Sequence, residues 1–491
     1  MHTEHSYSEL DTEFFRICQP TPVAAPKFLA FNHALAANLN FPTELCATEL
    51  GAQVLSGNRV PEWAHPLAQA YSGHQFGHLS PRLGDGRALL LAEVIAETGE
   101  RFDLQLKGAG PTPFSRRGDG RSALGPVVRE YLVSEAMHAL GVPTSRALAA
   151  VRTGEPVVRE GLIPGGILTR VAKSHLRIGT FQYVAMLQDR HKLTQLVDYA
   201  LERHYPAQRH AENPALALLE QVCQAQARLV AHWMSLGFVH GVMNTDNMLI
   251  SGQTIDYGPC AFLDQYQPAT VFSSIDREGR YAYRNQPAIA QWNLARLAEA
   301  LLPLLAATEA EAIAVATDRL NRFPELYQAE FQQRMAAKLG ISPQCHAEQP
   351  DAVASLIKQW LSLLEQQSAD FTASHRQLAH TLTAPLHPAG PNWLYCQRQD
   401  WLAFHQAWLQ LLTSQDLAAI HQQMNAVNPA FIPRNHQIEQ IIHQVVVLED
   451  DALFQQFAKD LTTPFAIEAE QTRWAEVPPV SDTAYRTFCG T

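Results

Sequence analysis

A strict alternation of apolar and polar residues marks the stretch Arg101–Lys107, which reads Arg-Phe-Asp-Leu-Gln-Leu-Lys. A period of two is typical of a β-strand with one buried face. The apolar run Ala88–Ile95 precedes this stretch, and Glu97–Glu100 between the two has the composition of a tight turn. The pattern predicts a β-hairpin that carries Lys107 on its polar face, at the end of the second strand.

Apolar residues at helical spacing follow from Leu124, with Pro126 near the start and Gly141 as a stop signal. We therefore predict a helix that ends at Gly141. Three strand-like pieces come next, at 146–152, 156–159 and 166–172. The segment as a whole is predicted to be β-rich and to hold one helix.

Beyond this segment the pattern predicts two amphipathic helices, at 192–204 and 215–236, the second of which ends at Gly237. Short β stretches are predicted at 248–251 and 254–256. Helical patterns then dominate, first at 287–302 and again from Glu309 to the end of the chain.

These elements predict an α+β protein with two lobes, the first rich in strands and the second mostly helical. Its length of 491 residues exceeds what one hydrophobic core usually supports. The predicted divisions are an N-terminal extension at 1–65, a β-rich lobe at 66–175, a second lobe at 176–310 and a helical C-terminal region at 311–491.

Charge and composition narrow the class of protein. The chain has 37 Lys and Arg against 48 Asp and Glu, a formal charge of -11, which repels a phosphate backbone, so we expect no nucleic-acid partner. The N-terminus has no apolar stretch, and no run reaches the roughly 18 apolar residues of a membrane span, so we expect a cytoplasmic protein with no membrane partner. Seven scattered cysteines argue against a disulfide framework or a zinc knuckle.

A loop with the polar residues of a protein-kinase catalytic segment follows the helix at 215–236. It begins at His240, includes Asn247 and leads to Asp256-Tyr257-Gly258. In protein kinases a His-Arg-Asp loop has its Asn at the same spacing from the His, and an Asp-Phe-Gly segment follows. Asn247 and Asp256 are therefore predicted to supply oxygen ligands to Mg²⁺ or Mn²⁺.

Lys107 and Glu130 are in the order expected of a kinase ion pair that directs a lysine to phosphate. Lys107 ends the predicted strand, and Glu130 lies on the predicted helix that follows. Glu135, on the same helix, is an alternative partner for the lysine.

One position departs from the kinase pattern. Two residues after His240, where kinases have the aspartate that accepts the substrate proton, the chain has Val242. Asp246 is the carboxylate left within the loop and is the candidate base. The alternative is that Asp246 caps a turn, as loop aspartates commonly do.

Glycine and arginine gather in two segments that flank the predicted hairpin. The first contains Gly84, Gly86 and Arg87, and the second, 116–121, contains Asp119 and Gly120 between arginines. Backbone N–H groups of such loops bind anions, although a single Gly-Asp-Gly is also a common turn. Arg170 and Arg177 lie near the end of the β-rich lobe and add two further cations. Arginine concentrated in an acidic protein favours an anionic ligand such as ATP.

Taken together, these residues resemble the selenoprotein O family of kinase-like protein adenylyltransferases over about residues 65–300. The resemblance rests on these motifs: Gly73-His74-Gln75-Phe76-Gly77, Leu83-Gly84-Asp85-Gly86-Arg87, Gln105-Leu106-Lys107-Gly108, Arg116-Arg117-Gly118-Asp119-Gly120-Arg121, Asn244-Thr245-Asp246-Asn247 and Asp256-Tyr257-Gly258-Pro259.

The resemblance implies a protein-kinase-like fold that binds ATP in reverse and passes AMP to Ser, Thr or Tyr of protein substrates, with release of pyrophosphate. It implies that Asn247 and Asp256 bind the metal, that Asp256 also contacts the nucleotide, and that Asp246 accepts the proton. Glu130 supports the lysine. The implied nucleotide-binding residues are Gly84, Gly86, Arg87, Lys107, Asp119, Gly120, Arg170 and Arg177.

Family members often have a redox-active Cys or selenocysteine near the C-terminus, a position matched here by Cys489. Its usual partner lies in a stretch where this chain has Phe272 and no cysteine. The resemblance therefore suggests a Cys260–Cys489 disulfide, and the alternative is two free thiols.

Two other functions stay open from the sequence. The first is an atypical kinase in which Asp246 serves transfer of the γ-phosphoryl group. The second is a pseudokinase that binds ATP without catalysis, which Val242 favours over the first.

Overall fold

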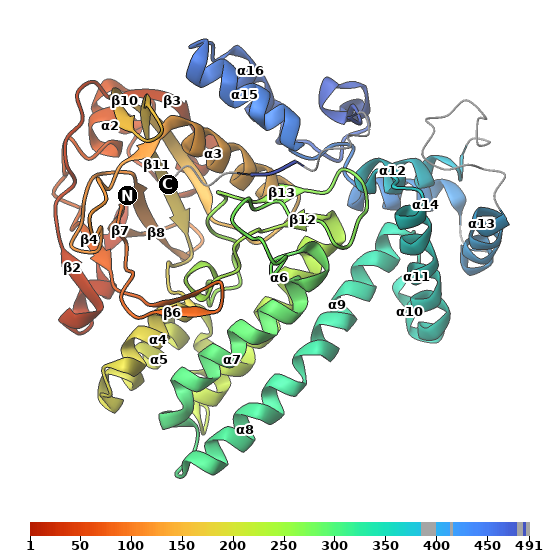
Figure 1. Cartoon of the computed structure of the whole chain (residues 1–491), viewed down its shortest axis with the longest axis horizontal. Coiled ribbons are helices and arrows are strands. Elements are labelled where there is room, and N and C mark those ends of the chain that lie inside the picture. The colour runs from red at the N-terminus through yellow and green to blue at the C-terminus, as the bar shows by residue number, and fades with distance from the viewer. Residues whose placement is uncertain (384–398, 413–415, 479–484, 488–491) are drawn as a thin grey trace.

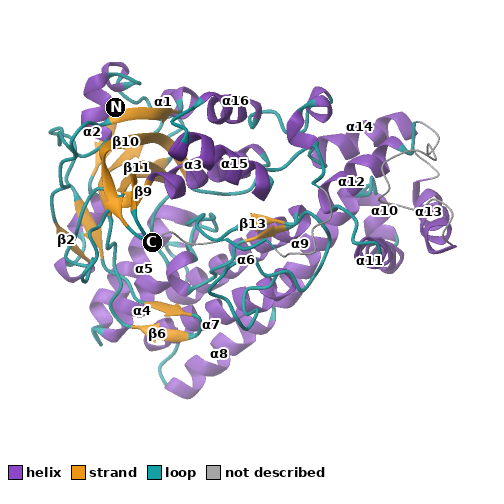
Figure 2. Ribbon diagram, turned by 45° about the horizontal axis from the view of Figure 1, so that its top comes forward, coloured by secondary structure: helices purple, strands orange, loops and turns teal. Residues whose placement is uncertain are grey.

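The computed structural model describes residues 1–383, 399–412, 416–478 and 485–487 (Figure 1). It is a mixed structure with a β-rich N-terminal region and a helical C-terminal region. Figure 2 shows most of the strands gathered at one side of the molecule, while helices make up most of the other side. Within the described residues, no helix is both long and apolar enough to span a membrane.

Nine strands of the described chain form one sheet, and all of their pairings are antiparallel. Its main path runs β2-β4-β7-β8-β11-β10-β3, while β1 pairs with β7 and β9 with β11. The strands are β1 (His2–Glu4), β2 (Phe15–Ile17), β3 (Lys27–Phe31), β4 (Leu67–Gln69), β7 (Ala88–Ile95), β8 (Arg101–Lys107), β9 (Ser122–Ala123), β10 (Arg146–Val158) and β11 (Leu162–Ala172).

Two small hairpins lie outside this sheet. The first pairs β5 (Gly73–Gln75) with β6 (His78–Ser80), and the second pairs β12 (Phe238–Val239) with β13 (Ala261–Phe262). The second hairpin brackets the loop that carries the kinase-like polar residues.

The helices come mostly after the sheet. Those of the first half are α1 (His33–Asn38), α2 (Glu49–Leu55), α3 (Leu124–Ala139), α4 (Ile178–Met186), α5 (Arg190–His204) and α6 (Pro214–Leu236). Those of the second half are α7 (Gln286–Leu305), α8 (Glu309–Asn321), α9 (Phe323–Lys338), α10 (Pro343–Glu348), α11 (Pro350–Gln366), α12 (Phe371–His380), α13 (Gln399–Leu412), α14 (Leu417–Val427), α15 (Asn435–Val447) and α16 (Ala452–Asp460).

Strong periodicity in the sequence is confirmed by the structure. The predicted hairpin is β7–β8, and the predicted helices are α3, α5, α6 and α7. Gly237 adopts a left-handed conformation with φ of 73°, which ends α6 as the glycine signal predicts. The helical character predicted from Glu309 on is also confirmed among the described residues.

One local prediction is confirmed as strand but with different bounds, and a second is wrong. The pieces at 146–152 and 156–159 form one strand, β10, because a register shift between Arg152 and Pro156 absorbs the residues between them. The stretches at 248–251 and 254–256 form no strand. They make single bridges to different segments, Leu249 to Arg177 and Thr254 to Thr144, so no ladder develops.

Residues 1–65 share the sheet with the residues that follow them. They contribute β1, β2 and β3, and their apolar side chains cover one face of it. That cluster includes Leu35, Phe41, Leu55, Leu104 and Ile167, all buried. On the other face, α3 packs in a second core that continues into α6 and α7.

The end of the chain returns to the sheet region. Figure 1 shows α15 and α16 beside α3, far from α10–α14, which precede them in sequence. Residues 485–487 lie against the segment at 272–274, where Thr487 N–H donates to Phe272 O at 2.8 Å.

Candidate active site

A cavity of about 330 Å³ lies between the sheet and the loop that follows β12. Eight of the predicted site residues line it: Gly86, Arg87, Lys107, Arg170, Arg177, Asp246, Asn247 and Asp256. A smaller cavity of about 170 Å³ adjoins it and shares Arg87, Lys107 and Asp256 with it. Residues from the sheet, α4, the loop and the Asp-Tyr-Gly segment thus meet at one place.

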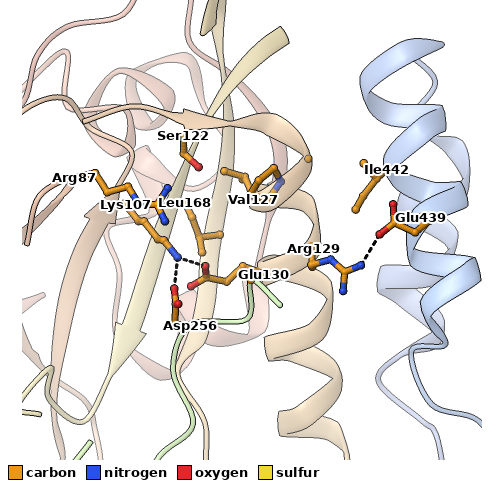
Figure 3. Close-up of a pocket in the computed structure, with 13 residues that line it drawn as sticks. Arg87, Lys107, Ser122, Val127, Arg129, Glu130, Leu168, Asp256, Glu439 and Ile442 are labelled. Atoms are coloured by element: carbon orange, nitrogen blue, oxygen red, sulfur yellow. Dashed lines mark hydrogen bonds and ion pairs between the residues drawn. The ribbon is translucent and has the colours of Figure 1, made fainter. Parts of the chain in front are cut away.

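Lys107 stands at the centre of an ion-pair network (Figure 3). Its Nζ lies 2.5 Å from Glu130 Oε2 and 2.8 Å from Asp256 Oδ1. Arg170 Nε donates to Glu130 Oε1 at 2.8 Å, and its Nη2 lies 3.8 Å from Asp256 Oδ1. The second predicted partner, Glu135, instead binds Arg146 and the N–H of Ala147.

The two cations keep both carboxylates of this network ionised. Burial alone raises the pKa of Glu130, but Arg170 and Lys107 outweigh it and the pKa is lowered. Burial also raises the pKa of Asp256, but Lys107 and Arg170 lower it by more. The pKa of Asp256 therefore falls far below its ordinary value. Asp256 has a φ of 67°, a left-handed conformation that a non-glycine residue rarely adopts. Such backbone strain is concentrated at functional sites.

Arg177 is buried at the beginning of α4, where it joins the sheet to the loop. Its Nη1 donates to the backbone oxygen of Asp246 at 2.9 Å, and its Nη2 lies 3.4 Å from Asp85 Oδ1. The guanidinium carbon lies 4.2 Å from the centroid of the Tyr71 ring. This arginine is therefore fixed from three sides while its side chain lines the cavity.

His240 holds the loop in shape from outside the cavity. Its Nε2 bonds the Ile255 carbonyl at 2.9 Å, and its Nδ1 accepts the Val242 N–H at 3.3 Å. Asn247 Nδ2 donates to Val242 O at 3.1 Å, and the side chain lines the cavity. Val242 occupies the cavity wall as an apolar residue, as the departure from the kinase pattern implies.

Asp246 is buried and has few partners. Its Oδ2 accepts from Gln75 Nε2 at 3.5 Å, and its Oδ1 has no hydrogen-bond partner among the described residues. Burial raises the pKa of Asp246 to about 6, although Arg177 opposes the shift. The residue lines the cavity, and its unpaired Oδ1 is buried next to Gly73.

The hairpin β5–β6 clamps this loop, and sequence reasoning missed its role. Three residues close a ring: the backbone N–H of His74 donates to Thr245 Oγ1 at 2.7 Å, Thr245 Oγ1 donates to Gln182 Oε1 at 2.6 Å, and Gln182 Nε2 bonds His74 Nδ1 at 2.8 Å. A Cβ on Gly73 would lie 2.2 Å from Asp246 Oδ1, so a larger residue there would displace the Asp246 side chain. The motif Gly73–Gly77 can be recognised in the sequence, but the sequence does not show that it contacts the loop at Thr245 and Asp246.

Three predicted nucleotide-binding residues line neither cavity. Gly84 packs against Phe114, where an added Cβ would come within 2.3 Å of the ring. Asp119 Oδ2 binds Arg159 Nη1 at 2.8 Å, and Gly120 accepts from Gly110 N–H at 3.1 Å. Asp119 and Gly120 lie in the loop between β8 and β9, and their nucleotide contacts stay a prediction.

The C-terminal region contributes to the site, which the sequence did not indicate. Ile442 and Glu439 of α15 line the smaller cavity, and Arg129 of α3 pairs with Glu439 at 2.5 Å (Figure 3). Cys260 is buried behind Asp256, with its Sγ 3.4 Å from Tyr257 O. Cys489 lies outside the described residues, so the predicted pairing of these two cysteines is untested.

The oxygen atoms of Asn247 and Asp256 are suitable ligands for a hard cation such as Mg²⁺, whose remaining ligands would come from ATP. Asn247 and Asp256 offer an amide and a carboxylate oxygen to the same cavity. Among the described residues, no group of three or more His, Cys, Asp or Glu could hold a metal unaided. Mg²⁺ is usually held by one or two carboxylates together with phosphate oxygens and water, so this incomplete set fits a metal that arrives with a nucleotide.

Comparisons with known proteins agree with this chemistry. A family model described as "Protein adenylyltransferase SelO" matches residues 1–462. The chain is 50% identical over 492 residues to the "Protein nucleotidyltransferase YdiU" of Anoxybacillus flavithermus, covering 99% of this chain and 98% of that protein. It is also 50% identical over 495 residues to that of Rhizobium johnstonii (99% and 97%) and over 493 residues to that of Geobacillus kaustophilus (99% and 99%).

These matches define the class of this protein first: it is a nucleotidyltransferase. Within that class, the chain belongs to the protein adenylyltransferase SelO family.

Proposed function

We propose that this chain transfers AMP from ATP to Ser, Thr or Tyr hydroxyls of other proteins, in a protein-kinase-like arrangement of two lobes. The single observation that carries the proposal is the ion-pair network of Lys107, Glu130, Arg170 and Asp256 beside a loop that has Val242 in place of the kinase base. The network supports binding of a triphosphate, and the missing base argues against ordinary γ-phosphoryl transfer.

In this proposal the two lobes are 66–175 and 176–310, with 1–65 completing the sheet and 311–491 closing one side. Arg87, Lys107, Arg170 and Arg177 contact the phosphates from the walls of the cavity. Gly86 borders the nucleotide from the cavity wall and Gly84 contacts it from the same turn, while Asp119 and Gly120 reach it from the neighbouring loop.

Asn247 and Asp256 would hold Mg²⁺ or Mn²⁺, which neutralises phosphate charge when bound. Glu130 keeps Lys107 and Arg170 in place before the nucleotide arrives. The cations then stabilise the negative charge that develops on the α-phosphate oxygens during transfer.

The acceptor hydroxyl oxygen bonds to the α-phosphorus, and its proton passes to Asp246. The bond between the α-phosphorus and the α,β-bridging oxygen breaks, and pyrophosphate leaves with the electron pair. Arg177 touches the backbone of Asp246, which couples the phosphate-binding side of the cavity to the base.

The test is transfer of label from ATP carrying ³²P at either the α- or the γ-phosphate. Protein-bound label from the α position alone is expected. Asp246→Asn should abolish it, while Asp198→Asn, on the exposed face of α5, should not. Label from the γ position would instead identify a kinase, and no label from either position would indicate a pseudokinase.

A further inference from the structure

A second groove, of about 860 Å³, lies apart from the candidate active site. Its walls come from α1, the turn between β7 and β8, the segment 141–146, α6, the turn 251–253 and α9. The residues described above as the candidate site do not line it. Its volume falls within the range of about 300–1,000 Å³ that is usual for small-molecule sites.

Three basic residues line this groove, two on α6 and one on α9, and these two helices run side by side (Figure 1). Arg228 and His232 are one turn apart on α6, and Arg334 faces them from α9. None of the three forms an ion pair or a side-chain hydrogen bond with another residue in the described part of the chain. Such a cluster is unexpected in a chain with a formal charge of -11.

Arg334 has a buried polar atom that no hydrogen bond within the described chain satisfies, which is energetically unfavourable. Its Nε is buried without a hydrogen-bond partner among the described residues. Burial lowers the pKa of Arg334, and only Glu330 opposes that shift. His232 Nδ1 is also buried without a described partner. Native proteins rarely leave such groups unpaired, so each requires an explanation.

The other charged residues of the groove do not explain these unpaired groups. Arg146 lines it but binds Glu135, and Lys173 lines it with its Nζ 3.1 Å from Glu100 Oε1. Glu97 and His138 also line the groove, and neither forms an ion pair with the three basic residues. Lys338, one turn beyond Arg334 on α9, is buried and adds positive charge near His232. Positive charge at the α6–α9 end is therefore unbalanced, whereas the opposite rim is neutralised.

We propose that Arg228, His232 and Arg334 form a binding site for a phosphate-bearing small molecule, separate from the candidate active site. Guanidinium groups match the geometry of phosphate oxygens, and a charge-assisted hydrogen bond would satisfy the buried Nε of Arg334. A neutral His232 has one N–H to donate to the same anion. Gly141 lies beside the His232 ring, where an added Cβ would stand 3.8 Å from Cε1, and so leaves the floor of the site open.

The site lies against the segment that joins the two candidate metal ligands. Gln253 lines the groove, and its side chain bonds the N–H of Lys173 at 2.8 Å and the oxygen of Thr144 at 3.0 Å. An anion in the groove thus sits behind the turn between Asn247 and Asp256. This binding site does not depend on the proposed AMP transfer.

The test is calorimetric titration of the full chain with pyrophosphate, inorganic phosphate and AMP, with a chelator present to exclude divalent metal. Four proteins are compared: wild type, Arg228→Gln/Arg334→Gln, Lys107→Gln and the surface control Arg209→Gln. We expect Lys107→Gln and Arg209→Gln to retain a site that the double variant loses or binds about tenfold or more weakly. Equal binding by the double variant and wild type, an equal loss in Arg209→Gln, or no binding of any probe would overturn the proposal.

A thermal unfolding series separates a binding role from a structural one. Without added anion, Arg334→Gln should unfold at the same temperature as wild type or a higher one, because an unpaired buried charge is removed. Pyrophosphate should raise the unfolding temperature of Lys107→Gln and leave that of Lys107→Gln/Arg228→Gln/Arg334→Gln unchanged. A lower unfolding temperature for Arg334→Gln without anion would show that this arginine supports the fold, and would contradict the proposal.

Discussion

Two groups of basic residues in the described part of this protein differ in what balances their positive charge. At the candidate active site, Lys107 and Arg170 share the carboxylates of Glu130 and Asp256. Between α6 and α9, Arg334 and Lys338 have no carboxylate within ion-pair distance among the described residues. The first is a closed network and the second is an open cluster.

The difference indicates two ways of preparing for an anion. A closed network fixes its cations before the ligand arrives, so little reorganisation is needed when charge develops on a phosphate. An open cluster carries an unfavourable burial energy until an anion enters. Removing a partner from the closed network should therefore destabilise the protein, whereas removing a charge from the open cluster should stabilise it.

The largest expected effect concerns Asp256. Asp256→Asn removes a proposed metal ligand and half of the negative charge that balances Lys107 and Arg170. We expect transfer of AMP to fall by about 1,000-fold or more, by analogy with the loss of other charge-stabilising groups. The rate of label incorporation from α-labelled ATP measures this, and Asp198→Asn serves as the control. Activity near that of wild type would refute the metal assignment.

Breaking the closed network at Glu130 should give the largest loss of stability. Glu130→Gln leaves Lys107 and Arg170 without their shared buried carboxylate. The free energy of unfolding should fall by about 3–5 kcal/mol, as for other broken buried ion pairs. Urea unfolding measures the change. Glu299→Gln, which removes an exposed partner of Arg296, should cost less than about 1 kcal/mol. Equal losses in the two variants would mean that the network is not closed.

Loss of the uncharged hydrogen bonds of Thr245, beside the same cavity, should lower the stability of the protein by an intermediate amount. Thr245→Val breaks the ring with His74 and Gln182 and leaves two polar groups without a partner. We expect a loss of about 2 kcal/mol in the free energy of unfolding, together with slower AMP transfer because the clamp on Asp246 loosens. Thr245→Ser retains the hydroxyl and should restore both properties. If Thr245→Ser is as impaired as Thr245→Val, the ring is not the cause.

The smallest effect is expected in the open cluster, and it depends on pH. Burial lowers the pKa of Lys338 to about 7, against 10.5 for an ordinary lysine. Between these values the unfolded chain holds a proton that the native protein lacks, so stability falls as the pH falls from 10.5 to 7 and changes no further below 7 on account of this group. Lys338→Met should add stability at pH 7 and flatten the pH dependence between pH 7 and 10.

Urea unfolding at several pH values measures the change for Lys338→Met, and Lys358→Met, on the exposed face of α11, is the control. A loss of stability at pH 7 in Lys338→Met would show that the lysine is balanced after all.

Sequence reasoning predicted the parts of the fold that have strong periodicity. The hairpin β7–β8 and the helix α6 were visible because many residues repeat one pattern. Strands β1, β2 and β3 were missed because they are three to five residues long, and tertiary pairing rather than local pattern forms them.

Some residues of the candidate site could likewise be predicted from the sequence, and some of its contacts could not. Lys107, Glu130 and Asp256 were predicted because each has a fixed place in the kinase order, and the structure brings them together. The partners of Arg177 and the ring through Thr245 were not predicted. His74 and Thr245 are 171 residues apart, and no periodic signal links single polar residues at that separation.

The central claim is that one cavity orients ATP for attack at its α-phosphorus. A crystal structure with a non-hydrolysable ATP analogue and Mg²⁺ tests it most directly. The account predicts phosphate oxygens in contact with Lys107, Arg170 and Arg177, the metal on Asn247 and Asp256, and the α-phosphorus as the phosphorus nearest Asp246. A γ-phosphorus nearest Asp246, or a nucleotide bound elsewhere, would contradict it.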